Sequence, residues 1–390
     1  MTSPKQLSED LLRKIRTFIK RNPKALPKEL VKKFHGLTIG QAKDLLTPLN
    51  PEHELDLEIE KSRLSKEVGY NKKTLKLLQD RLEKAEKERD AVRRLKDEIS
   101  CYKITRRSDS EESSATAVAV GSDWHIEERV DPSTVNDLNN SNLEITGKRA
   151  TLFFQSLLRL IEAKQKSINI KTLILALLGD FISGSIHDEL MEGNLLLPID
   201  ATLEVQKRII SGINFLLDNT DLDFVIPCHS GNHGRITKKQ RHSTESGNSL
   251  EYIMYHNIAD HFSDNPRVKF MISRGYHSFI DVEGFVIRFH HGHDIRYAGG
   301  VGGIFIPAYK AIAQWQKSRA VNLDVFGHFH QLKYGGNFVC NGSLIGYNAY
   351  ALSIKADFER PQQAFFLINH QRKQLTDLSP IWLEDLNDVH

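Results

Sequence analysis

The stretch AVAVGSDWH at residues 117–125 joins an apolar run to an Asp-x-His pair through a glycine. The same arrangement, an apolar run followed directly by Asp, Asn or His, recurs four times in LILALLGD (173–180), FVIPCHSGNH (224–233), VIRFHHGH (286–293) and LDVFGHFH (323–330). Short apolar runs that end in such turn residues predict buried strands. The sequence therefore predicts five strands that each end in a cluster of polar side chains.

Amphipathic segments alternate with these runs along residues 118–390. Strands are expected at 116–120, 172–178, 223–227, 285–290 and 323–326, and helices at 148–164, 199–218, 249–262 and 307–320. This alternation is typical of an α/β domain. Glu283-Gly284 and Gly335-Gly336 are hairpin signals, so the sheet is expected to be mixed.

The polar clusters are candidates for one shared site. In open α/β sheets the carboxyl ends of the strands meet in one crevice, so residues far apart in sequence converge there. Carboxylate, amide and imidazole groups suit manganese, iron, zinc or nickel. A lone His-x-His is more often structural than a ligand, but five such clusters in order favour a metal site. The other histidines are expected to be structural, with His187 and His229, which lie near the motifs, as the best exceptions.

This motif order resembles the calcineurin-like metallophosphoesterase superfamily, whose pattern is Asp-x-His, Gly-Asp, Gly-Asn-His, a lone His and Gly-His-x-His. The resemblance spans about 116–350. Asn341-Gly342-Ser343 is similar to a shortened form of the Asn-Pro-Gly-Ser that often follows the last motif. The resemblance implies a four-layer αββα sandwich, in which two sheets pack face to face between helices.

The resemblance also implies two divalent metal ions, with manganese expected first and iron, zinc or nickel as alternatives. One ion would take Asp123, His125, Asp180 and His330. The second would share Asp180 and add Asn232, His291 and His328, where His291 is preferred over His293 because the ligand His of the family usually precedes Gly. His233 is similar to the catalytic histidine of the family.

The implied mechanism is two-metal hydrolysis of a phosphate ester. Two ions hold a bridging water, lower its pKa and neutralise charge in the transition state, so that hydroxide attacks phosphorus. His233 would protonate the leaving group. Two departures from the family concern specificity: Gly234-Arg235 replaces the acidic residue that often follows Gly-Asn-His, and the second motif reads GDFISG without its frequent second polar residue.

Residues 1–50 are predicted to form a basic helix-turn-helix-like module. They contain eleven Lys or Arg against four Asp or Glu, while the whole chain of 390 residues has a net charge of only +3. Helical spacing from Leu11 to Ile19, Pro27 at the start of a second helix, and a Thr38–Gln41 capping box predict three short helices. The third would be the recognition helix by analogy. The alternative is a packing module that binds no nucleic acid.

Residues 51–105 are predicted to form one long charged helix, a probable coiled coil. Its heptad seam is best between Leu64 and Ala85. We expect homo-oligomerisation through residues 51–100, or else a single helix that packs along its own chain. The Ser-rich residues 106–117 are expected to be a linker between this helix and the metallophosphoesterase domain at 118–390.

Bulk properties are those of a cytoplasmic globular protein. There is no apolar run long enough for a membrane span and no apolar signal core, so no membrane partner is expected. Cys101, Cys228 and Cys340 are an odd number of cysteines without regular spacing, which fits a reducing compartment.

The predicted substrate is DNA. The basic module, the predicted seam and the segment RITKKQRH (235–242) together favour a nuclease similar to the DNA-repair exonuclease branch. Candidate substrate-binding residues are Arg235, Lys238, Lys239, Arg241 and His293. One alternative is a nucleotide or small-molecule phosphodiesterase or phosphatase, and another is a DNA-binding scaffold with a vestigial site.

Overall fold

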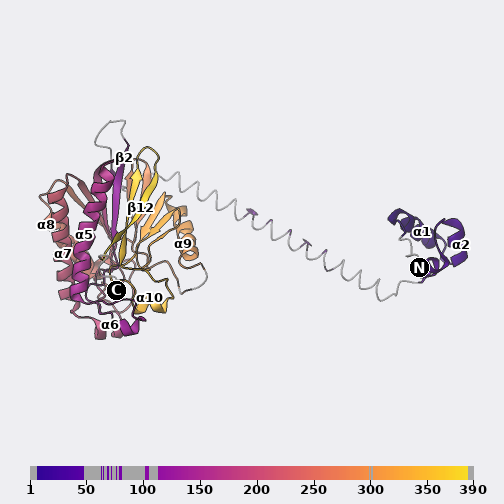
Figure 1. Ribbon diagram of the computed structural model, residues 1–390, viewed down its shortest axis with the longest axis horizontal. Helices are drawn as coiled ribbons and strands as arrows, with labels where there is room; N and C mark the ends of the chain where they lie inside the picture. Colours follow the sequence, from indigo (N-terminus) through magenta and orange to yellow (C-terminus); the bar gives the residue numbers. More distant parts are fainter. Residues whose placement is uncertain are drawn as a thin grey trace. The chain divides into compact units, whose positions relative to one another are not determined.

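The computed structural model describes residues 7–47, 102–104, 113–297, 299 and 302–384, together with eight separate positions between 63 and 80. The chain divides into two compact units, Met1–Glu88 and Arg89–His390. Each is described by itself (Figure 1).

The larger unit contains a first sheet in the order β12-β11-β2-β3-β4-β5. Its strands are β2 (Ser114–Gly121), β3 (Asn169–Leu177), β4 (Asp223–Cys228), β5 (Val268–Ile272), β11 (Gln362–Asn369) and β12 (Gln374–Trp382). The pairs β2–β3, β3–β4 and β4–β5 are parallel, whereas β11 pairs antiparallel with both β2 and β12.

A second sheet has the order β1-β6-β7-β8-β10-β9. Its strands are β1 (Tyr102–Ile104), β6 (Ser278–Val282), β7 (Phe285–Phe289), β8 (Leu323–Phe326), β9 (Lys333–Tyr334) and β10 (Phe338–Cys340). The β6–β7 and β9–β10 hairpins are antiparallel, and β7–β8 is parallel. The mixed character of the sheets and both predicted hairpins are therefore confirmed.

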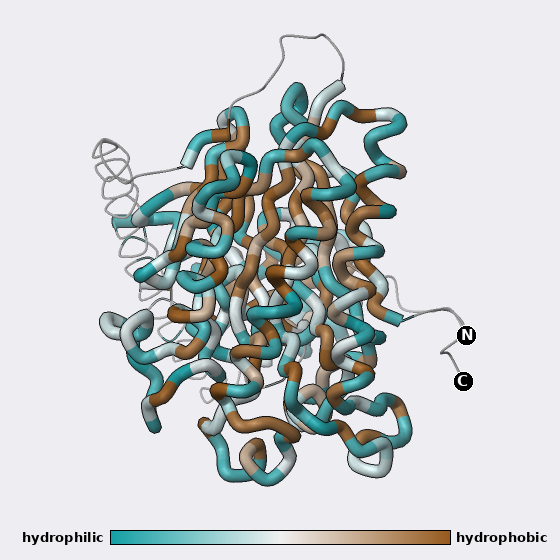
Figure 2. Tube along the Cα trace, turned by 90° about the vertical axis from the view of Figure 1, so that its left-hand side faces the viewer, coloured by the Kyte–Doolittle hydropathy of each residue, from teal (hydrophilic) through white to brown (hydrophobic). Residues whose placement is uncertain are grey.

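The two sheets pack face to face. Alternation along β2 shows how: Val118 and Val120 face an apolar layer that also holds Ile287 and Val325 of the second sheet, whereas Ala117 and Ala119 face the opposite way. Figure 2 shows the hydrophobic strands in the middle of this unit and hydrophilic loops around them.

Helices cover the outer face of each sheet. The first sheet is covered by α5 (Leu143–Gln165), α7 (Pro198–Asn219) and α8 (Leu250–His261), which share a core with it, and α9 (Phe305–Ser318) packs on the second (Figure 1). The remaining short helices are η1 (Pro132–Thr134), α6 (Asp188–Gly193), η2 (Ser246–Asn248) and α10 (Ala349–Ser353). The described residues thus form an α/β sandwich with the expected layer order.

Two predicted boundaries were wrong. Tyr102–Ile104, expected at the end of the charged helix, is strand β1 and pairs in parallel with β6. The expected linker 106–117 also ends early, because β2 already begins at Ser114. The hydroxyls of Ser114 and Thr116 lie 3.2 and 2.9 Å from the ring nitrogens of His370, so polar residues are accommodated in this buried strand. Residues 105–112 lie outside the described residues.

The smaller unit consists, where it is described, of three helices: α1 (Glu9–Arg21), α2 (Pro27–Lys33) and α3 (Ile39–Leu46). Ser8 caps α1, Pro27 opens α2, and Thr38 with Gln41 forms the expected capping box of α3. Ile15, Leu30, Leu37 and Ala42 form a small core. The helix-turn-helix identification itself stays a prediction.

Most of the predicted coiled coil lies outside the described residues. The eight described positions between 63 and 80 are helical and exposed, among them Val68 of the predicted seam. Among the described residues, no helix combines the length and apolar composition needed to cross a bilayer.

Candidate metal centre

Five of the predicted ligands have left-handed backbone conformations. Non-glycine residues seldom adopt a positive φ, and such strain persists where the surrounding structure enforces it, often at functional sites. The φ angles are 56° for Asp123, 46° for His125, 52° for Asp180, 71° for His328 and 54° for His330. Each of these residues lies just beyond the end of β2, β3 or β8. The chain turns sharply at each strand end and directs these side chains into one place.

One group of ligand atoms contains Asp123, His125 and His330, and a second contains Asp180, His291 and His328. Within each group the candidate ligand atoms lie within 4.8 Å of one another.

Further contacts complete and connect these groups. His291 Nε2 lies 2.9 Å from Asp180 Oδ2 and 3.2 Å from Asn232 Oδ1, so Asn232 joins the second group. His125, Asp180 and His233 form a third set of close ligand atoms. The structure therefore brings all seven predicted ligands and His233 together, with Asp180 between the two groups.

The ligand rings are held by their other nitrogen. His291 Nδ1 donates to the Leu178 carbonyl over 2.6 Å, which leaves Nε2 facing Asp180. His125 Nδ1 lies 2.9 Å from Ser183 Oγ, and that hydroxyl donates to Glu128 over 3.2 Å. Partners of this kind fix the tautomer and orientation of metal-binding histidines.

The Asp123 carboxylate is held by a relay of side chains. Ser122 Oγ donates to Oδ2 over 2.5 Å, and the His328 N–H donates to Oδ1 over 2.9 Å. Asn341 Nδ2 donates to Ser122 Oγ over 2.9 Å, while Asn341 Oδ1 accepts from the Ala364 N–H. Asn341 belongs to the Asn-Gly-Ser segment that resembles the last family motif. It thus supports the predicted ligand Asp123 through the hydroxyl of Ser122.

The electrostatics of the centre favour a bound cation. Burial lowers the pKa of His330 to about 3 and holds that of His125 well below its usual range, so both rings are neutral near pH 7. Burial also lowers the pKa of His291, but the carboxylates of Asp180 and Asp123 outweigh it and raise the value to about 10. Burial raises the pKa of Asp123 to about 7. The two carboxylates therefore attract positive charge into this buried position.

These residues could hold divalent metal ions. His125 Nε2 and His330 Nδ1 are buried and lack a hydrogen-bond partner among the described residues. Buried imidazole nitrogens without partners are costly unless something binds them. The donor set of carboxylate, amide and imidazole groups matches manganese, iron, zinc or nickel rather than a thiolate-bound metal. The buried Cys228 and Cys340 are free thiols outside the ligand groups.

His233 lies beside the predicted ligands, and its Nε2 has no hydrogen-bond partner among the described residues. Its N–H donates to Asp180 Oδ1 over 2.8 Å, and its ring Nδ1 donates to the Ser183 carbonyl over 2.9 Å. The ring packs edge-on against His125, with centroids 4.8 Å apart. His187, expected to be a possible exception, lies farther out, with its ring centroid 6.4 Å from that of His233. The Nε2 of His233 is thus the atom left for chemistry.

The predicted substrate-binding residues divide into two kinds. Lys238, Lys239 and Arg241 are exposed. Arg235 instead braces its own loop by donating to the Asn232 carbonyl over 2.5 Å.

His293 is enclosed behind the second ligand group. Its Nε2 lies 3.4 Å from Glu245 Oε1 and 3.3 Å from Gln240 Nε2. The structure thus favours His291 over His293 as the residue that faces Asp180.

Sequence reasoning missed the buried acids that support the ligand loops. Glu127 accepts N–H bonds from Ser183 and Gly184, each over 2.9 Å, and Glu251 accepts from Phe181 and Gly231. Their positions in the sequence carry no signal, because Glu127 in the pair Glu127-Glu128 and Glu251 in an amphipathic segment both look like solvent-facing residues.

Sequence reasoning also missed Tyr350 of α10. Its ring centroid lies 5.2 Å from that of His330, and 37% of the residue is exposed. It therefore belongs to the rim of the centre.

Comparisons with known proteins leave the family open. No family model matches the chain, and neither does any curated protein. A crystal structure of a Staphylococcus aureus protein, provisionally named a 5′-nucleotidase and bound to α-ketoglutarate, aligns with 70% of this chain at 10% identity and a TM-score of 0.29. The alignment covers 55% of that protein, so the chain spans about half its length.

Proposed function

We propose that this chain is a metal-dependent phosphoesterase of the calcineurin-like type that hydrolyses phosphodiester bonds of DNA. The observation that carries the hydrolase assignment is the convergence of two ligand groups, from five strand ends, on the shared carboxylate of Asp180. The resemblance of the ordered motifs to that superfamily points to the same chemistry.

Each of the two ligand groups would hold one metal ion. Asp123, His125 and His330 would hold one and Asn232, His291 and His328 the other, with Asp180 contributing to both. Divalent ions supply Lewis-acid polarisation of a phosphoryl group and lower the pKa of water. The chain supplies the fixed geometry, since its ligands lie in sharp turns at the strand ends and are held by further hydrogen bonds.

His233 would act as the general acid. Its Nδ1 is committed to the Ser183 carbonyl, so a proton on Nε2 is held in a defined direction. This residue lies next to Asn232, yet its ring packs on His125 of the other group. That position lets Nε2 deliver a proton to a leaving oxygen at the edge of the centre.

DNA as the substrate is supported by exposed positive charge close to the centre. Lys238, Lys239 and Arg241 follow the Gly-Asn-His motif and pair with no acidic side chain among the described residues. Exposed Lys and Arg bind phosphates without reading sequence.

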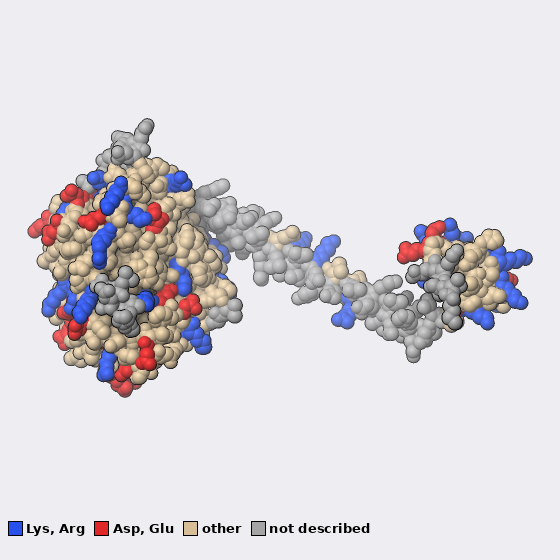
Figure 3. Space-filling view, in the orientation of Figure 1, with Lys and Arg blue, Asp and Glu red and all other residues tan. Residues whose placement is uncertain are grey.

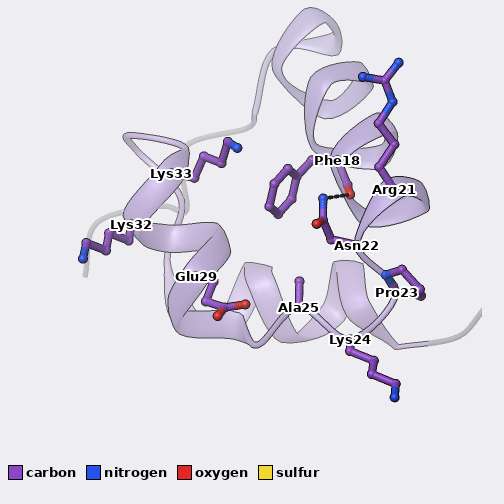
Figure 4. A pocket seen from close by; sticks show the side chains of 9 residues that line it. All are labelled: Phe18, Arg21, Asn22, Pro23, Lys24, Ala25, Glu29, Lys32 and Lys33. Carbon is purple, nitrogen blue, oxygen red and sulfur yellow. Dashed lines mark hydrogen bonds between the residues drawn. The ribbon is translucent and has the colours of Figure 1, made fainter.

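The helical unit offers a second basic surface. Lys and Arg side chains predominate over acidic ones on its visible face (Figure 3). A hollow of about 670 Å³ lies between α1 and α2, rimmed by Arg21, Lys24, Lys32 and Lys33. In Figure 4, Phe18 and Asn22 face this hollow while Lys24 and Lys32 point outward.

These four cations pair with no acidic side chain in the described part of the chain. Glu29, also at the hollow, is occupied as an acceptor for the Leu26 N–H over 2.9 Å. By contrast, α3 carries one cation, Lys43, next to Asp44. These charges support a DNA-binding surface on α1 and α2 rather than on α3, the helix expected from the helix-turn-helix analogy.

One assay panel tests the proposal. Linear and circular DNA, single and double strands, RNA and a small phosphodiester are each incubated with Mn²⁺ or EDTA. Mn²⁺-dependent cleavage of DNA supports the nuclease. Turnover of the small ester alone favours the small-molecule phosphodiesterase, and DNA binding without any turnover favours the scaffold.

A further inference from the structure

The two loops that carry Asp180 and Asn232 touch through their main chains. Gly179, at φ +86°, lies so close to Gly231 that a Cβ on Gly179 would be 2.2 Å from the Gly231 nitrogen. A Cβ on Gly231 would in turn lie 2.1 Å from Asp180 Oδ1. Only glycine fits at both positions, so the distance between these ligand loops depends on how their backbones are held together.

Glu251, in the first turn of α8, bridges those backbones. Its Oε1 accepts the Phe181 N–H and its Oε2 accepts the Gly231 N–H, each over 2.7 Å. Phe181 follows Asp180, and Gly231 precedes Asn232. The carboxylate is fully buried, and each of its oxygens holds one ligand loop.

The start of α8 is itself tied to the loop after His233. The Leu250 N–H donates to the Gly234 carbonyl over 2.8 Å, and Arg235 and Ser249 form a β-bridge. A Cβ on Gly234 would lie 2.8 Å from Glu251 Cγ and 3.0 Å from its Cδ. The Glu251 side chain therefore occupies the space into which a side chain at position 234 would point.

We propose that Glu251 is a positioning residue that sets the spacing of Asp180 and Asn232, and that it takes the place of an acidic side chain at position 234. The missing acid after Gly-Asn-His is thus supplied from α8, nearly twenty residues later in the chain. This inference rests on the proposed metal-dependent hydrolase, because its effect is on metal binding.

The test compares Mn²⁺ affinity by calorimetry, and kcat/KM on a phosphodiester, in the full chain. Glu251→Gln keeps the shape but presents an amide NH₂ to one of the two N–H donors. Loss of a partner that supports metal ligands typically costs about 10- to 100-fold in affinity or activity, which is the expected loss here.

Ile258→Val is the matched control. It trims a fully buried side chain of the same helix without removing any hydrogen bond to the Asp180 or Asn232 loops. Its Mn²⁺ affinity should stay within about twofold of the wild type, well inside the 10- to 100-fold range expected for lost support of a ligand.

The rescue variant Glu251→Ala/Gly234→Glu returns a carboxylate from the other side of the same space. It should bind Mn²⁺ more tightly than Glu251→Ala, which a purely structural role for Glu251 does not predict. The comparison of Glu251→Ala with the double variant also tests the inference if Glu251→Gln does not fold.

Three results would overturn the inference: wild-type Mn²⁺ affinity in Glu251→Gln, an equal loss in Ile258→Val, or a double variant no better than Glu251→Ala. A wild-type chain that binds no Mn²⁺ would instead overturn the proposed function.

Discussion

The main-chain N–H of His233 donates to Oδ1 of Asp180 over 2.8 Å, while Oδ2 of the same carboxylate lies 2.9 Å from His291 Nε2. One carboxylate thus orients the proposed acid and also faces a ligand of the second group. Replacing Asp180 can therefore disturb the centre in two ways, through lost charge and through a lost hydrogen bond.

Asp180→Asn separates these effects, because an amide oxygen can still accept the His233 N–H while the charge is removed. We expect nearly complete loss of hydrolysis and a marked fall in bound metal, since Asp180 is the ligand proposed for both ions. Elemental analysis and a phosphodiester assay measure the two outcomes. Asp218→Asn, an exposed position at the end of α7, is the control. Full metal content and activity in Asp180→Asn would show that the assignment is wrong.

His233→Ala should lose most turnover while it keeps both metals. Removal of a positioned general acid typically lowers the rate by about a hundred- to ten-thousand-fold. The loss should be smaller on a nitrophenyl ester, because its leaving group needs no proton. His187→Ala, whose ring lies near that of His233, should have little effect. A metal-depleted His233→Ala enzyme, equally slow on both substrates, would indicate that His233 only braces its loop.

Charge removal at the hollow of the helical unit should weaken DNA binding in a salt-dependent manner. The variant replaces Arg21, Lys24, Lys32 and Lys33 with Gln. The slope of log K against log salt should fall by about 0.9 for each phosphate of duplex DNA that the protein no longer neutralises. Fluorescence anisotropy at several salt concentrations measures it, while turnover of a small phosphodiester should stay unchanged.

The matched control makes the same change in charge away from the hollow. It replaces Arg13, Lys14, Lys28 and Lys43 with Gln. If both variants lose affinity equally, the unit binds by net charge alone. If neither does, the helices are a packing module.

The predicted seam is tested by oligomeric state. The variant replaces Leu75, Leu78 and Leu82 with Glu. This places like charges where helices would meet, so an oligomer formed through residues 51–100 should dissociate. Light scattering measures the mass. The control places Glu at Lys72, Lys76 and Gln79, which are helical and exposed. An unchanged mass in the seam variant would mean that self-association does not use this segment.

Strand ends could be predicted from the sequence because each combines a local apolar run with a turn residue. Leu323–Phe326, for example, forms β8 within the predicted bounds, and His328 and His330 follow it. The strand Tyr102–Ile104 could not be predicted from the sequence, because these three residues form a strand only by pairing with β6. Glu251 was missed for a similar reason. Its burial depends on how α8 packs on two distant loops, and no local pattern encodes that.

Gly231→Ala tests how tightly the centre is packed. The added Cβ would lie 2.4 Å from the Asp180 nitrogen, and both groups belong to loops that cannot move apart without stretching the Glu251 bridge. Overpacking typically costs about 1–3 kcal/mol. For a domain of this size that corresponds to a fall in Tm of roughly 2–5 °C, and metal affinity should fall with it. Thermal unfolding with and without Mn²⁺ measures both.

Gly193→Ala is the matched glycine control for this experiment. Gly193 ends α6, and no heavy atom lies within 4 Å of the position its Cβ would take. Ala is favoured over Gly in helices by up to about 1 kcal/mol, so Tm should hold or rise. A Gly231→Ala protein with unchanged Tm and unchanged Mn²⁺ affinity would show that the Asp180 and Asn232 loops can separate freely. In that case the buried carboxylate of Glu251 would not set the spacing of these two loops.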